Sequence, residues 1–127
     1  IKPLLPDAEF STQIDLRLAQ VETPETPEGL VRMQVRGLYS ADPLVRRAGP
    51  LQTSPEGRRA EAVYVNPQSA GGHTDGTMVR IRQDGAEAEL RLVLDDDVPA
   101  GIAVTVAGAP ALARLGAPGT TVTLARA

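Results

Sequence analysis

The side chains best suited to chemistry in this chain are one histidine, a run of three aspartates and a pair of neighbouring arginines. His73 lies in a glycine-rich stretch, but it is the only histidine and the chain has no cysteine. A lone histidine without a nucleophile or a second ligand forms neither a catalytic triad nor a metal centre. We interpret His73 as a loop residue, and we expect no catalytic residue and no metal-ligand set in this chain.

The three aspartates, Asp95, Asp96 and Asp97, could offer carboxylate oxygens to a hard cation. Side chains of successive residues at the end of a strand point in alternate directions, and the alternate-residue spacing of an EF-hand loop is missing. The pattern therefore favours a solvated turn, and weak calcium binding at the surface remains the alternative.

The arginine pair, Arg46 and Arg47, follows Asp42-Pro43, a typical helix start in which a carboxylate caps free N–H groups. We expect about two helical turns with one apolar side, after which Gly49-Pro50 ends or distorts the helix; that side would contain Leu44, Val45, Ala48 and Leu51. Guanidinium groups pair bidentately with carboxylates and phosphates. Arg46 and Arg47 are thus candidates for docking to a partner, and the alternative is a solvated helix face.

Composition limits the class of protein. The 127 residues can form one domain with a true core. With 13 basic and 16 acidic residues and only three aromatic ones (Phe10, Tyr39 and Tyr64), neither charge nor stacking favours nucleic acid as a partner. The longest uncharged run, 98–113, is interrupted by proline and glycine, so we expect no insertion into a membrane.

The domain organisation is expected to be simple. We predict a single domain over 1–127, in which residues 1–29 form an irregular lead-in with one short strand at Ile14, Leu16 and Leu18. Because the chain opens on Ile1 rather than methionine, we expect it to be a C-terminal fragment of a larger subunit.

Most of the remaining chain has the patterns of short strands. Val31, Met33 and Val35 alternate with polar residues, which predicts a strand that buries this apolar face. Similar patterns predict strands at 60–65, 102–106 and 120–124, a capped helical turn opened by Asn66-Pro67, and a short helix at 109–115.

The most specific local signal is Asp84-Gly85, which is typical of a two-residue type I′ hairpin. Counting outward from this turn gives the cross-strand partners. Both arginines then face glutamates on one side of the hairpin, and Ile81 and Val79 face apolar residues on the other. The predicted pairs are Gln83/Ala86, Arg82/Glu87, Ile81/Ala88, Arg80/Glu89 and Val79/Leu90. The sequence as a whole predicts a mainly β protein, a closed barrel of six or seven short strands with two or three short helices.

The order of turns resembles one known family. Val63–Ala70, Asp75-Gly76 with Met78–Ile81, the Asp84-Gly85 hairpin and Val98–Gly101 are similar to the molybdopterin-dinucleotide-binding domain of molybdenum and tungsten oxidoreductases. The resemblance implies a double-psi β-barrel. It also implies that Asn66 and Ser69 lie where active members bind the cofactor, although capping of the next turn explains Asn66 without a ligand.

A second segment, Tyr39–Thr53, resembles the start of this domain in one component of bacterial NADH:quinone oxidoreductase, respiratory complex I, namely the component related to the molybdenum enzymes. This resemblance implies a non-catalytic structural or docking domain whose parent complex transfers electrons from NADH to quinone. It implies no cofactor in this fragment, iron–sulfur clusters in upstream domains, and a place in the cytoplasmic, peripheral arm. The partners would be other domains of the parent subunit and other subunits of the complex.

Two departures from the active enzymes suggest that the cofactor site is vestigial. No Thr-Gly-Arg motif with a nearby histidine stands within 36–53, and Ser69 replaces a commonly acidic residue. The alternative is the molybdopterin-dinucleotide-binding domain of an active molybdenum oxidoreductase, such as a formate dehydrogenase. A third interpretation, an unrelated double-psi barrel that binds partners by itself, is disfavoured by the residue pattern of Tyr39–Thr53.

Overall fold

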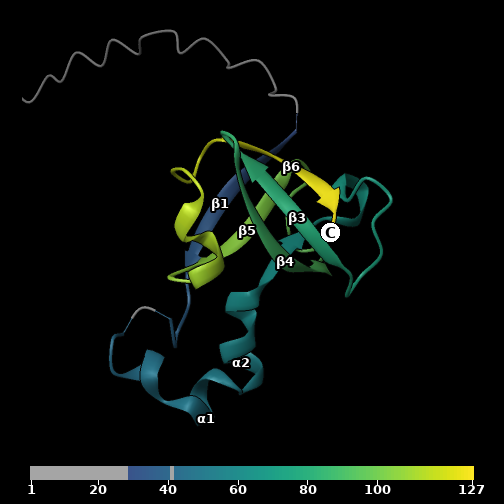
Figure 1. Ribbon diagram of the computed structural model, residues 1–127. Coiled ribbons are helices and arrows are strands. Elements are labelled where there is room, and N and C mark those ends of the chain that lie inside the picture. Colours follow the sequence, from purple (N-terminus) through teal and green to yellow (C-terminus); the bar gives the residue numbers. More distant parts are fainter. Residues whose placement is uncertain (1–28, 41) are drawn as a thin grey trace, which may run out of the picture.

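The computed structural model describes residues 29–40 and 42–127. Within them the chain forms a six-stranded barrel with a helical extension below it (Figure 1). The strands are β1 (Leu30–Arg36), β2 (Ala62–Val65), β3 (Met78–Gln83), β4 (Ala86–Leu94), β5 (Ile102–Ala107) and β6 (Thr121–Arg126). The helices are α1 (Gly49–Gln52) and α2 (Pro55–Arg58), with 3-10 turns η1 (Val45–Arg47), η2 (Arg59–Glu61), η3 (Pro67–Ser69) and η4 (Pro110–Arg114). The strand predicted around Leu16 lies outside the described residues.

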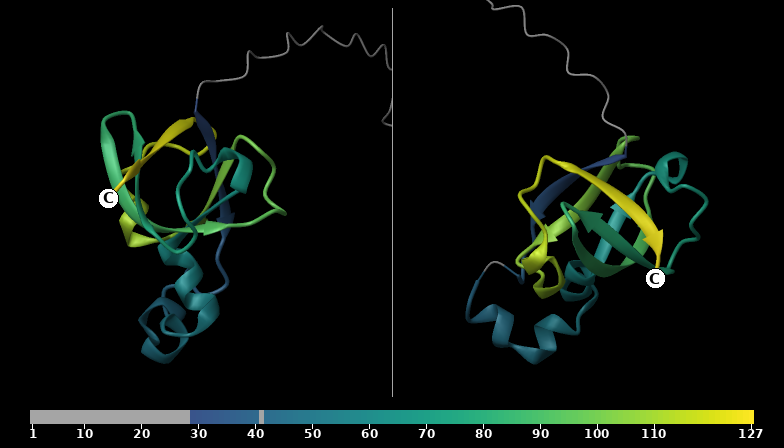
Figure 2. Two further views of the ribbon diagram at one scale, coloured as in Figure 1. Left: turned by 90° about the vertical axis from the view of Figure 1, so that its right-hand side faces the viewer. Right: turned by 45° about the horizontal axis from the view of Figure 1, so that its top comes forward.

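The strands close in the order β1-β5-β2-β4-β3-β6, and the ring is visible in the left view of Figure 2. Alternate residues of each strand point into it, so a short chain can surround one continuous apolar core. The fully covered members of that core include Val63, Val65, Val79, Ile81 and Leu92. The predicted mainly β fold with a closed barrel is confirmed.

The predicted hairpin is present in every detail of its register. Asp84 and Gly85 have φ angles of 50° and 82°, as a type I′ turn requires, and all five predicted residue pairs face one another across β3 and β4. Arg82 Nε donates to Glu87 Oε1 at 2.6 Å, and Arg80 Nη2 donates to Glu89 Oε1 at 2.8 Å. The turn and the side-chain pattern therefore specify the same register.

The barrel has an internal two-fold repeat. Exchanging β1, β2 and β3 with β4, β5 and β6 reproduces the strand order, the parallel pairs β1/β5 and β2/β4, and the antiparallel contacts. The registers also correspond: Val31↔Ile102 and Arg32↔Ala103 in one half match Arg91↔Ala62 and Leu92↔Val63 in the other. This arrangement is the double-psi pattern implied by the resemblance.

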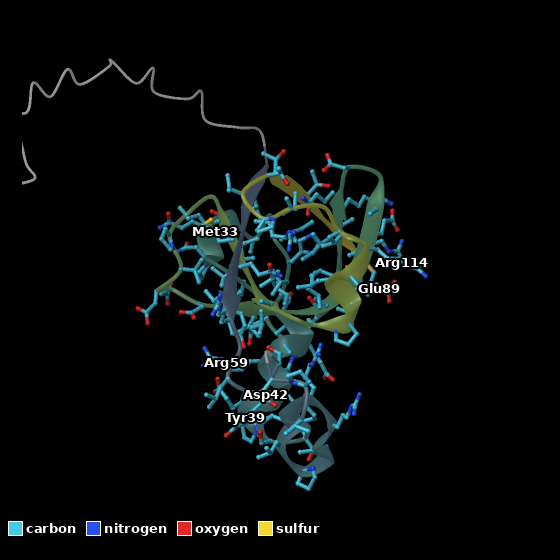
Figure 3. All side chains as sticks on the ribbon, turned by 90° about the vertical axis from the view of Figure 1, so that its left-hand side faces the viewer. Met33, Tyr39, Asp42, Arg59, Glu89 and Arg114 are labelled. Atoms are coloured by element: carbon cyan, nitrogen blue, oxygen red, sulfur yellow. The ribbon has the colours of Figure 1, made fainter. Side chains whose placement is uncertain are left out.

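The orientation predicted for β1 is wrong. Met33 and Val35 are 47% and 49% exposed, whereas Leu30 and Arg32 point inward and are 8% and 2% exposed; Figure 3 shows Met33 on the outside of the barrel. Apolar alternation indicates a core face because a charged residue is rarely buried. Arg32 departs from this rule because its guanidinium finds hydrogen-bond partners inside the barrel end.

The helix predicted after Asp42 is also different. The chain forms only the 3-10 turn η1, and a separate helix, α1, begins at Gly49 with Pro50 in its first turn. Proline fits a first helical turn because the missing N–H would have had no intrahelical partner. Gly49-Pro50 therefore starts a helix instead of ending one, and the expected apolar side stays open: Leu44 is 78% exposed and Leu51 is 37% exposed.

Candidate functional site

The segment between β1 and β2, residues 37–61, is here called the extension, and it projects from one end of the barrel (Figure 1). Ser40 and Gly57 are the buried residues among those of the extension that the structure describes. Arg46 and Arg47 are both exposed in η1, close in sequence to the exposed side chains of Leu38, Leu44 and Leu51. The extension thus combines positive charge with uncovered apolar area, a composition suited to a protein partner.

The base of the extension is joined tightly to the barrel. Ser40 Oγ donates to the Ala107 carbonyl oxygen at 2.6 Å. Gly108 has a φ of 82°, and a Cβ atom there would lie 2.7 Å from the Ser40 carbonyl oxygen. A side chain at Gly37 would overlap both Ser40 Oγ and Val106 Cγ1. These close approaches fix the direction in which the extension leaves the barrel.

Internal hydrogen bonds hold the shape of the extension. Gln52 Nε2 donates to the carbonyl oxygens of Tyr39 and Val45, at 3.1 and 3.0 Å, and so connects α1 to η1. Ser54 caps α2 by accepting from the Gly57 N–H at 3.1 Å. The Arg59 guanidinium lies 5.5 Å from the centre of the Tyr64 ring, which ties the end of α2 to β2. The arginine pair is therefore presented on a defined surface.

Asp42 provides the predicted capping bonds without a full helix. Its Oδ1 accepts from the N–H groups of Leu44 and Val45, at 2.7 and 3.0 Å. These bonds favour the ionised form, and they hold the pKa of this carboxyl below its ordinary value. The carboxylate thereby fixes the turn that carries Arg46 and Arg47.

Asn66 and Ser69, the candidates for cofactor binding, both hold the loop after β2 in place. Asn66 Oδ1 accepts from the Gln68 N–H at 2.9 Å, and its Nδ2 donates to the Val98 carbonyl oxygen at 2.8 Å. Ser69 Oγ accepts from the Gly101 N–H at 2.8 Å. The capping predicted for Asn66 is confirmed, and the two side chains connect η3 to the turn before β5.

His73 lies beside a cavity of about 430 Å³ that Ser69 also lines. The polar side chains of this lining are those of His73, Ser69 and Thr123 on β6.

The three aspartates after β4 lie in a turn, in which Asp95 Oδ1 accepts from the Asp97 N–H at 3.0 Å. Across the residues that the structure describes, no three histidine or carboxylate side chains gather into a set that could hold a metal ion.

Arg32 is a polar residue that the sequence analysis missed. Its Nε donates to Gln83 Oε1 at 2.9 Å and its Nη2 to the Gly116 carbonyl oxygen at 2.5 Å. Its Nη1 is buried and has no hydrogen-bond partner among the described residues. Burial lowers the pKa of this guanidinium from its ordinary value. No local sequence signal reveals it; only the repeat in the structure, in which Leu-Val-Arg at 30–32 occupies the positions of Leu-Arg-Leu at 90–92, relates Arg32 to a core position.

The comparisons with known proteins leave the family open. No family model matches the chain, and no curated protein matches it in sequence. Among solved structures it is similar to acetylene hydratase from Pelobacter acetylenicus, with 16% identity over 68% of this chain and a TM-score of 0.42. The match spans only 13% of the length of that protein. A likeness of this size is too low to assign the chain to a family.

No helix in the described part of the chain has the length and apolar character needed to cross a lipid bilayer. The longest helical segment there, η4, has five residues.

Proposed function

We propose that this chain is a docking domain without catalytic activity, and that its parent is the component of an NADH:quinone oxidoreductase that is related to the molybdenum enzymes. In this proposal the barrel is an inherited scaffold and the extension binds neighbouring domains or subunits of the peripheral arm. The observation that carries the proposal is the projecting extension with exposed Arg46, Arg47 and Leu44.

The position of the sequence resemblance supports this assignment. Tyr39–Thr53, the segment that resembles the complex I component, lies within the extension, and most of its described residues are exposed. A core segment can resemble a relative because packing restricts its residues, but an exposed segment has little such restriction. Resemblance in an exposed segment therefore points to recognition by a partner.

The use of Asn66 and Ser69 supports the non-catalytic part of the proposal. Both Asn66 side-chain groups are engaged within the chain, and Ser69 accepts a backbone hydrogen bond. A bound dinucleotide would have to compete with these bonds, each of which contributes about 1 kcal/mol.

The docking part can be tested by charge reversal in the full-length parent gene. We expect Arg46→Glu/Arg47→Glu to reduce the fraction of the gene product that co-migrates with NADH:quinone oxidoreductase on a native gel by about tenfold or more, because like charges then meet across the contact. The matched control is Arg114→Glu/Arg126→Glu, an equal charge change on exposed barrel residues. Wild-type co-migration of the Arg46/Arg47 variant contradicts the proposal, as does absence of the unaltered chain from the assembly.

The non-catalytic part has a separate test. Molybdenum and pterin are measured in the purified full-length parent. We expect neither in stoichiometric amount. One equivalent of each would instead support the alternative, in which this domain binds the cofactor of an active molybdenum enzyme.

A further inference from the structure

The end of the barrel near η4 contains a buried positive charge at a position where the other half of the repeat has an apolar side chain. Arg32 is equivalent by the repeat to Leu92 of the other half. Leu92 is fully buried in the core. The repeat therefore has an apolar side chain at the equivalent position of its other half. Burying a guanidinium instead costs free energy unless its charge and donors are satisfied.

The partners of Arg32 satisfy its donors only in part and leave its charge uncompensated. Gln83 and the Gly116 carbonyl, both neutral, accept two hydrogen bonds, and Nη1 has no acceptor among the described residues. Those residues also include no carboxylate within 4.0 Å of the Arg32 guanidinium. Buried arginines are ordinarily paired with an anion, so this one lacks the group that normally accompanies it.

A cavity of about 550 Å³ lies between β1, η1 and η4, and its lining includes Arg32 and also Gly116, whose carbonyl oxygen accepts from the Arg32 guanidinium. Arg32, Gln34 and Arg46 are the polar side chains of its lining, and the other lining residues are small, apolar or proline. The lining therefore includes two arginines and one glutamine but no residue with a carboxylate. Charges close to a low-dielectric wall act on a ligand more strongly than charges in open water.

We propose that this cavity binds a small oxyanion, a carboxylate or a phosphate group, between Arg32 and Arg46. Arg46 reaches the ligand from the extension, while Arg32 supplies positive charge from inside the barrel. Since Nη1 is covered in this conformation, a direct bond to it requires a local side-chain movement. The site goes beyond the docking role, and its occupancy would couple η1 of the extension to the barrel end.

The test uses the 127-residue chain labelled with ¹⁵N and follows the Nε–Hε resonance of Arg32, whose proton is held by Gln83. Inorganic phosphate and acetate are titrated separately, with chloride at equal ionic strength as the reference. We expect a saturable shift with at least one of the two anions. A shift with phosphate alone assigns a phosphate site, and a shift with acetate assigns a carboxylate site.

Matched variants separate the site from a general effect of charge. Arg46→Gln should weaken binding by about tenfold or more, because it removes a charge-assisted contact. Arg47→Gln, its neighbour outside the cavity, should bind as the unaltered chain does. Arg32→Leu lacks the Nε–Hε probe, so its binding is followed through the backbone amides of Gly108 and Gly116 in the cavity lining, which also report on binding by the unaltered chain. This variant should remain folded, with amide spectra of a native barrel, and show no saturable shift. Absence of a saturable shift with both anions, or equal binding by the Arg46 and Arg47 variants, overturns the proposal.

Discussion

The two halves of the barrel share one backbone plan but differ in what connects and fills them. Between β4 and β5 the chain makes a seven-residue turn, 95–101, whereas the corresponding connection between β1 and β2 is the extension, residues 37–61. Inside the barrel, the second half has Leu90 and Leu92 where the first half has Leu30 and Arg32. The second half, β4 to β6, therefore contains little beyond what the barrel fold requires.

The difference separates scaffold from function. Because β4 and β5 are joined by a short turn, the long extension is not needed to form the barrel. Because Leu92 is fully buried at the equivalent position, the shared backbone plan does not by itself call for a charged residue at position 32. Both additions occur in the first half, and Arg46 of the extension lines the same cavity as Arg32.

The largest effect on the free energy of unfolding is expected when an arginine, the residue at position 32 of the first half, is placed at the equivalent position 92 of the second half. Leu92→Arg should lower the free energy of unfolding by about 4 kcal/mol or more, because no acceptors await a guanidinium at that position. Urea unfolding followed by circular dichroism measures the loss. Leu92→Met is the control, and it should cost less than about 1.5 kcal/mol. A mild effect of Leu92→Arg would mean that the two ends of the barrel are equally tolerant of charge.

The reverse exchange should have a smaller effect. Arg32→Leu removes an uncompensated buried charge but leaves Gln83 Oε1 and the Gly116 carbonyl without a donor. These changes oppose each other, so we expect the free energy of unfolding to move by no more than about 2 kcal/mol. The same urea experiment measures it. A loss as large as that of Leu92→Arg would show that Arg32 is essential to the fold.

The smallest expected effect is the coupling free energy of the ion pairs on the outer face of the β3/β4 hairpin. The hairpin of β3 and β4 carries the pairs Arg80/Glu89 and Arg82/Glu87, while the positions on β6 that correspond to these arginines are Thr123 and Ala125. A double-mutant cycle on Arg82 and Glu87, both to alanine, should give a coupling of about 0.2–1 kcal/mol that falls with added salt. A coupling that salt leaves unchanged would argue against a solvent-exposed ion pair.

The sequence predicted the parts of the fold that short-range rules determine. The hairpin register follows from Asp84-Gly85 and the alternation beside it, and the cap at Asn66 follows from one side chain and the next proline. The face of β1 could not be predicted in the same way, because Arg32 is stabilised by Gln83, 51 positions later, and by Gly116, 84 positions later. Local alternation contains no information about such partners.

The docking role of the candidate residues stays a prediction, and the structure shows only where they lie. Charge and chemistry indicate Arg46 and Arg47, and both are exposed in the structure. Their setting differs, since Gly49-Pro50 begins α1 and leaves Leu44 outside any core. Arg32 could not be found from its neighbours in sequence, which suggest an outward position, and only the repeat relates it to Leu92.

The most direct test of the docking role shortens the connection between β1 and β2 in the full-length parent. Residues 35–61 of this chain correspond to residues 95–101 in the register of the repeat, so they are replaced with a copy of the turn 95–101. We predict that the barrel still folds cooperatively, as shown by thermal unfolding of the shortened domain, and that the parent no longer co-migrates with NADH:quinone oxidoreductase on a native gel. A folded barrel that still co-migrates at the wild-type level would contradict the claim that the extension is the docking element.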